Sequence, residues 1–77
     1  MDPRLYQERD FQEGIIKEIK GYAEGSAEIY FKDGDRFIVA SDCNRQLIEV
    51  FGYEGVVGQK IRFVACQDLI EYFEPID

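Results

Sequence analysis

The sequence has no histidine and no tryptophan, only two cysteines, and no long apolar run. Without histidine, the chain cannot form a Ser-His-Asp triad, a Cys-His dyad or a histidine-ligated metal site. Two cysteines alone do not supply the four ligands of a structural zinc site. No stretch approaches the roughly 20 apolar residues that a membrane-spanning helix requires. We therefore expect no metal site, no cofactor and no membrane segment.

Length and charge favour a small binding module. The chain has 77 residues, with 16 acidic and 9 basic side chains and a formal net charge of −7 at pH 7. A chain of this length forms one small core, without the deep clefts in which carboxylate pairs acquire perturbed pKa values. We therefore expect a protein that is not an enzyme and that acts by binding.

The N-terminus and the cysteines bear on the cellular compartment. The chain starts with acidic and basic residues and no apolar run follows them, which predicts a cytoplasmic protein without a signal peptide. Thiols stay reduced in the cytoplasm, so Cys43 and Cys66 are expected to be small buried hydrophobic residues rather than a disulfide. Cys43 also falls in the first turn of a predicted helix, a position that can lower the pKa of a thiol.

Three strands are expected in the first half of the chain, over residues 14–20, 27–32 and 36–40. Apolar and polar residues alternate in the second and third of these runs, as they do in half-buried strands. In the first run, the buried candidates Ile16 and Ile19 are three residues apart, which predicts a β-bulge between them. Asp33-Gly34 between the second and third runs is a strong signal for a hairpin turn.

A helix is expected next, because Cys43, Leu47 and Phe51 are spaced by four residues. The Ser41-Asp42 pair is a good N-cap for this helix, and Gly52 suits its C-terminal end. Two further strands are predicted, over residues 60–65 and 69–73. The second half of the chain therefore adds one helix and two strands.

The predicted order of elements is three strands, one helix and two strands. In so small a domain, closing five strands into a barrel removes the exposed sheet edges. A helix between the third and fourth strands is the arrangement of the OB barrel. The sequence thus predicts a mainly β protein, a five-stranded OB-like closed barrel over residues 14–77 with one helix between strands three and four. Residues 1–13 are expected to form an arm, or a short helix that begins at Asp2-Pro3.

Four segments resemble the cold-shock domain, a nucleic-acid-binding OB barrel. Residues 14–17 resemble its first strand, 20–23 the start of its first RNA-binding motif, 35–41 its second motif and 58–63 its fourth strand. Bacterial translation initiation factor 1, another small OB barrel, is similar in outline. The resemblance implies the OB fold and a function in binding single-stranded RNA or DNA.

The chain departs from the cold-shock pattern at aromatic positions. Glu18 and Ile19 stand where the family has Trp and Phe, and Val39 and Ala40 stand where its second motif has His and Phe. Aromatic stacking supplies roughly 1–3 kcal/mol per base in single-strand binders. The resemblance therefore supports the fold more than it supports the function.

A basic, tyrosine-bearing surface is expected on the outer face of the first three strands. The candidates for binding single-stranded nucleic acid are Lys17, Lys20, Tyr22, Tyr30, Lys32, Arg36 and Phe37. Phe37 is included although the alternation of its strand makes it face inward. Acidic residues in the same strands dilute the positive charge on which non-specific nucleic-acid binding depends. A solvated sheet face is the alternative interpretation.

An acidic, aromatic-bearing edge is expected near the C-terminus, where residues 66–77 include four acidic and no basic side chains. The candidates for binding a partner protein are Tyr53, Asp68, Glu71, Tyr72 and Glu74. Such an edge suits a basic partner, and one form of this function is an inhibitor or decoy of a nucleic-acid-handling protein. A polar strand face that keeps the protein soluble is the alternative. We therefore predict a protein-binding module, with a cold-shock-type single-strand binder as the second hypothesis and the oligomeric state open.

Overall fold

A computed structural model of the chain describes residues 6–22 and 24–76. A short 3₁₀-helix, η2 (Glu8–Asp10), precedes the first strand. The strands are β1 (Gln12–Gly21), β2 (Ala27–Phe31), β3 (Arg36–Val39), β4 (Lys60–Cys66) and β5 (Leu69–Pro75). The α-helix, α1 (Ser41–Phe51), lies between β3 and β4. No helix in the described part of the chain is long and apolar enough to cross a membrane.

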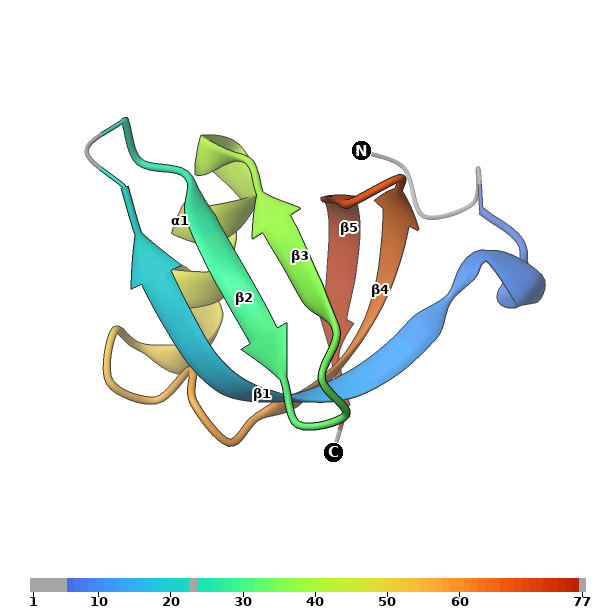
Figure 1. Cartoon of the computed structure of the whole chain (residues 1–77), viewed down its shortest axis with the longest axis horizontal. Coiled ribbons are helices and arrows are strands. Elements are labelled where there is room, and N and C mark those ends of the chain that lie inside the picture. Colours follow the sequence, from blue (N-terminus) through green and yellow to red (C-terminus); the bar gives the residue numbers. More distant parts are fainter. Residues whose placement is uncertain (1–5, 23, 77) are drawn as a thin grey trace.

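The strands close into a barrel in the order β1-β2-β3-β5-β4. The first part of β1 pairs antiparallel with β4 and its second part with β2, because the strand curves beneath the barrel (Figure 1). β2 and β3 form an antiparallel hairpin, as do β4 and β5. β3 and β5 complete the barrel through a short parallel ladder that pairs Ile38 with Leu69 and Val39 with Ile70. The predicted OB-like closed barrel with its helix between strands three and four is confirmed.

A β-bulge allows β1 to pair with both β2 and β4. The register with β2 shifts between Ile16 and Glu18, which confirms the bulge predicted from the spacing of Ile16 and Ile19. A bulge bends a strand and increases its twist, and closure of a small barrel needs both effects. β1 begins at Gln12, two residues earlier than predicted, because its first residues pair with β4.

Three phenylalanines form the centre of the core. Phe31 stacks on Phe63 with ring centroids 4.9 Å apart, and Phe37 meets both rings edge-on. β1 passes directly over this stack at Gly14, where an added Cβ would lie 2.6 Å from Cδ1 of Phe31. The close approach of β1 to the core therefore requires a residue without a side chain at position 14.

Helix α1 closes one end of the barrel. Its buried residues Cys43 and Leu47 join the hydrophobic core. The helix begins at Ser41 with Ala40 as its N-cap and without a side-chain cap, so the predicted cap at positions 41 and 42 is wrong. Gly52 ends the helix as predicted, with a φ of 81° in the left-handed region that favours glycine.

Candidate binding surfaces and clefts

The outer face of β1, β2 and β3 brings together four of the predicted nucleic-acid-binding residues around Glu28 of β2. The hydroxyl of Tyr22 donates to Oε1 of Glu28, and the hydroxyl of Tyr30 donates to Oε2 at 2.5 Å. Nη1 of Arg36 lies 3.3 Å from Oε1 of Glu28. Nζ of Lys20 lies 5.2 Å from the ring centroid of Tyr30. We call these five residues the Glu28 cluster.

The carboxylate at the centre of this cluster sets its electrostatics. Hydrogen bonds from Tyr22 and Tyr30 hold the pKa of Glu28 below its ordinary value, and the same bonds raise the pKa of both tyrosines. Glu28 also forms an ion pair with Arg36, which offsets the positive charge of that side chain. A phosphate group that approached the two rings would therefore meet a negative charge between them. Glu28 is one of the acidic residues expected to dilute the positive charge of this face, and its central position among the tyrosines was not predicted.

Three residues of the same predicted set lie apart from the cluster. Phe37 is buried in the core against Phe31 and Phe63, so its assignment to the binding surface is wrong, as the alternation of β3 already indicated. Lys32 lines a shallow cleft beside Gly14 at the other end of the barrel. Lys17 is exposed on β1 at the bulge.

The predicted acidic edge is divided between different parts of the molecule. Glu71, Tyr72 and Glu74 belong to β5, and Asp68 lies in the turn between β4 and β5. Tyr53 follows α1 and lines a cleft that none of the other four residues lines. The structure therefore brings together three of the five predicted partner-binding residues on one strand.

Arg62 of β4 organises the outer face of β4 and β5. Its guanidinium lies 4.1 Å from the ring centroid of Phe11. Nη1 and Nη2 each lie 3.3 Å from a carboxylate oxygen of Glu8, and Nε lies 3.6 Å from Glu74. The hydroxyl of Tyr72 donates to Glu74 at 2.9 Å. We call these five residues the Arg62 cluster.

Aromatic rings hold the N-terminal segment against this face. Tyr6 stacks on Tyr72 with ring centroids 5.8 Å apart, and Phe11 meets Tyr72 edge-on at 6.1 Å. Burial and the bond to Glu74 raise the pKa of Tyr72. Part of the predicted acidic edge is therefore occupied by the chain's own N-terminal segment. The helix start predicted at Asp2-Pro3 lies outside the described residues.

A cleft of about 450 Å³ lies between the first turns of α1 and the start of β5. The buried residues Cys43 and Ile70 line it, together with the carboxylates of Asp42 and Glu71. Its described lining residues include no basic side chain. β3 pairs with β5 only as far as Ile70, so from Glu71 onward this side of β5 has no partner strand among the described residues. We call this space the acidic cleft.

Both cysteines are free thiols. Cys43 is buried as predicted, and burial raises the pKa of its thiol to about 11, although a position in the first helical turn can lower it. Desolvation of the thiolate outweighs the favourable position in the first helical turn. Cys66 is exposed at the end of β4, so its predicted burial is wrong.

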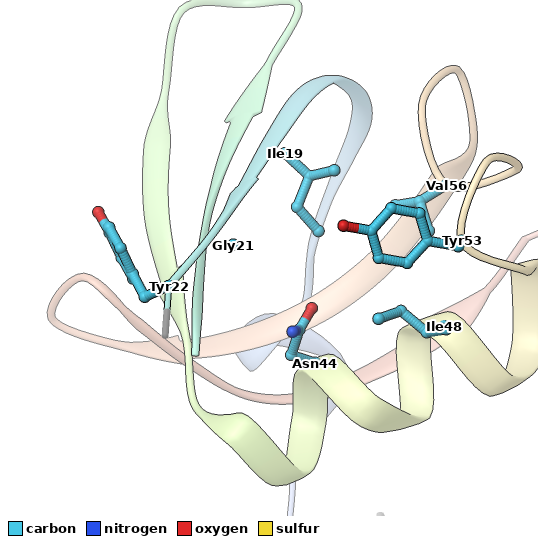
Figure 2. A pocket seen from close by; sticks show the side chains of 7 residues that line it. All are labelled: Ile19, Gly21, Tyr22, Asn44, Ile48, Tyr53 and Val56. Atoms are coloured by element: carbon cyan, nitrogen blue, oxygen red, sulfur yellow. The ribbon is translucent and has the colours of Figure 1, made fainter. Parts of the chain in front are cut away.

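A second cleft, of about 360 Å³, lies between the end of β1, α1 and the loop after α1 (Figure 2). Its apolar lining consists of Ile19, Ile48 and Val56. In Figure 2, the side-chain oxygen of Asn44 and the hydroxyl of Tyr53 are directed into this space, whereas the ring of Tyr22 points away from it. We call this space the Gly21 cleft, because Gly21 of β1 forms part of its wall.

Comparison with known proteins identifies no relative: no family model, no curated protein and no solved structure matches the chain. Among residues 6–22 and 24–76, no three His, Cys, Asp or Glu residues are grouped so that they could hold a metal ion. A function for this chain therefore has to be inferred from its own surfaces and clefts.

Proposed function

We propose that the protein is a non-catalytic binding module whose partner is another protein, and that an extended basic segment of this partner binds at the acidic cleft. One observation carries the proposal. An unpaired side of β5 coincides with a cleft whose charged lining residues, Asp42 and Glu71, are both acidic.

The unpaired side of β5 supports binding by strand addition. Extended peptides bind exposed sheet edges through main-chain hydrogen bonds, and adjacent pockets take alternate side chains. A closed barrel has few such edges. Here the β3 ladder ends at Ile70 while β5 continues to Pro75. A partner strand at this position would continue the sheet next to the acidic cleft.

Charge supports a basic partner. Asp42 and Glu71 provide the local negative charge, and the whole chain carries a net charge of −7. Complementary charge accelerates encounter and rejects partners of the wrong sign. Association is therefore expected to weaken as salt increases, because screening shortens the range of these interactions.

Backbone amide shifts of the full chain, followed by NMR during titration with a short peptide that alternates lysine and threonine, test the proposal. We expect shifts in β5 and in the first turns of α1, and no shifts with a peptide that alternates glutamate and threonine. The double variant Asp42→Lys/Glu71→Lys should abolish binding. The control variant Glu49→Lys/Glu54→Lys changes the net charge equally at exposed residues outside the cleft and should retain binding. Equal loss in both variants, or shifts elsewhere, would contradict the proposal.

A single-stranded nucleic-acid binder is the second candidate, favoured by the common face of Lys20, Tyr22, Tyr30 and Arg36. Titration with oligonucleotides of about 12 nucleotides tests it. Micromolar binding at about 150 mM salt that is lost in Tyr30→Ala/Lys20→Ala and strengthened in Glu28→Gln would establish this function. Absence of binding even at low salt would eliminate it.

A further inference from the structure

The Gly21 cleft exists because β1 has no side chain at its last residue. Gly21 pairs with the buried Ala27, so a side chain at position 21 would project toward the same inner face as Ala27 and Ile19. Its φ is outside the left-handed region, and an added Cβ would meet no atom within 4 Å. Neither the backbone nor the packing requires glycine here. Glycine in a strand costs roughly 0.5–1 kcal/mol relative to alanine and often marks the approach of a ligand.

Asn44 presents an unsatisfied acceptor at the cleft. Its Nδ2 donates to the carbonyl oxygen of Gly25 at 2.8 Å, which fixes the orientation of the side-chain amide. Its Oδ1 is buried and has no hydrogen-bond partner among the described residues. Leaving a buried acceptor unpaired costs about 1–3 kcal/mol. A ligand with an N–H group would supply the missing donor.

The rest of the lining restricts the class of ligand. None of the described lining residues carries a formal charge, which disfavours phosphates and other ions. Ile19, Ile48 and Val56 offer no partner to further polar groups of a ligand. Tyr53 is 79% exposed and overhangs the cleft, where its ring can close over a flat molecule (Figure 2). A volume of about 360 Å³ lies within the range of small-molecule sites.

We propose that the Gly21 cleft binds a neutral, planar aromatic heterocycle with one N–H donor, of the indole type. The N–H group donates to Oδ1 of Asn44, the ring lies against the aliphatic side chains, and Tyr53 stacks on its open face. This site is separate from the acidic cleft, since the two share no lining residue.

Titration of the full chain with indole, followed by backbone amide shifts in NMR, tests the proposal. We expect shifts in residues 19–21, 44–48 and 53–56. N-Methylindole has the same ring without the donor and should bind about tenfold more weakly, the effect of one hydrogen bond to a buried acceptor. Equal binding of the two compounds, or no saturable binding of indole at millimolar concentration, would overturn the proposal.

Two variants test the site from opposite sides. Gly21→Val fills the cleft with a residue that strands favour and should abolish binding of indole. Tyr53→Leu removes the stacking ring at an exposed position and should weaken binding several-fold without changing the fold. The control Val57→Ala changes an exposed neighbour outside the cleft and should bind as the natural chain does.

Other outcomes assign the cleft differently. Unchanged binding in both Gly21→Val and Tyr53→Leu would place indole elsewhere and overturn the proposal. Tighter binding of a tryptophan-containing peptide than of free indole would assign the cleft to a partner's side chain and overturn the small-molecule proposal. Asp42→Lys/Glu71→Lys should leave binding of indole unchanged, so this proposal and the proposed protein-binding function fail independently.

Discussion

The Glu28 cluster and the Arg62 cluster lie on different outer faces of the barrel and are built alike with opposite charge. In one, a carboxylate binds two tyrosines and an arginine; in the other, a guanidinium binds an aromatic ring and two carboxylates. They differ in the distance along the chain that they bridge. Tyr22 and Tyr30 are six and two residues from Glu28, whereas Glu8 is 54 residues from Arg62.

This difference separates two roles for surface charge. The Glu28 cluster orders side chains within a meander of neighbouring strands, so it shapes a face that the strand register already creates. The Arg62 cluster ties the N-terminal segment to β4 and β5, so it contributes to the tertiary structure. We therefore expect changes at Arg62 to affect stability. Changes at Glu28 should affect mainly the titration of Tyr22 and Tyr30 and the binding of single-stranded nucleic acid proposed for this face.

The largest expected effect lies in β1, which pairs with β2 of one face and with β4 of the other. Gly14→Ala should destabilise the protein by about 1–3 kcal/mol, because the new methyl group would overlap the ring of Phe31, which is held against Phe63. Gly21→Ala is the matched control on the same strand, since its Cβ would meet no atom within 4 Å. Urea unfolding of the two variants provides the measurement. Equal loss of stability in both would mean that the strand itself, and not contact with the core, demands glycine.

The next effect compares the two arginines. Arg62→Met should cost about 1–2 kcal/mol, because it removes the contact with Phe11 and two ion pairs from a side chain that is only 28% exposed. Arg36→Met should cost at most about 0.5 kcal/mol, because that side chain is 47% exposed and pairs only with Glu28 among the described residues. Thermal unfolding of both variants measures the difference. A larger loss for Arg36→Met would reverse the assigned roles.

A third prediction concerns pH and separates the clusters without a large change in stability. The hydrogen bonds to Glu28 raise the pKa of Tyr22 and Tyr30 above 10.0, so Glu28→Gln should move two tyrosine titrations to lower pH in ultraviolet absorbance. Glu74→Gln, the control, should move only that of Tyr72. If Glu28→Gln leaves the tyrosine titrations in place, the carboxylate does not bind the two hydroxyls.

The sign of the linked stability follows from these shifts. The pKa of Glu28 is lowered, so its contribution is present above its ordinary value of 4.5 and is lost as the pH falls through the lowered value. The contribution of the raised tyrosine pKa values is present below pH 10 and is lost as the pH rises through them. Thermal unfolding against pH should therefore show a shallower decline at both extremes in Glu28→Gln.

The smallest expected effect is at Lys20. Lys20→Gln removes its contact with the ring of Tyr30 at an exposed position and should cost about 0.5 kcal/mol or less. Lys17→Gln serves as the matched control at an exposed position of the same strand. Urea midpoints measure both variants, and a loss above 1 kcal/mol at Lys20 would mean that the Glu28 cluster also supports the fold.

Local patterns predict most of the barrel. The bulge between Ile16 and Ile19, the turn at Asp33-Gly34 and the end of α1 at Gly52 each depend on residues close together in the chain. The alternation of β2 also places Glu28 and Tyr30 on one face, so the centre of the Glu28 cluster could have been predicted. The role of Glu28 was not predicted because this residue was considered only as a negative charge, and not as a hydrogen-bond acceptor for the two tyrosines.

Long-range contacts could not be predicted from the sequence, for a physical reason. The pairing of Arg62 with Glu8 follows from barrel closure, which brings the first strand beside the fourth, and no short sequence pattern encodes it. The exposure of Cys66 likewise depends on where β4 leaves the barrel. The acidic cleft depends on the early end of the β3 ladder at Ile70. Phe37, in contrast, could have been assigned correctly from the sequence, because the alternation of β3 already placed its side chain in the core.

The short parallel ladder between β3 and β5 is where we expect the native protein to open first. The amide of Ile38 donates to the carbonyl oxygen of Asp68 across this seam, whereas the other ladders extend over four or more residue pairs. Sub-global opening begins where the fewest contacts must break. The barrel should therefore open between β3 and β5 into a curved sheet. The amide proton of Ile38 should then exchange with solvent before the amide protons of β4. Separation of β3 from β5 would lengthen the unpaired side of β5 without unfolding the rest of the molecule.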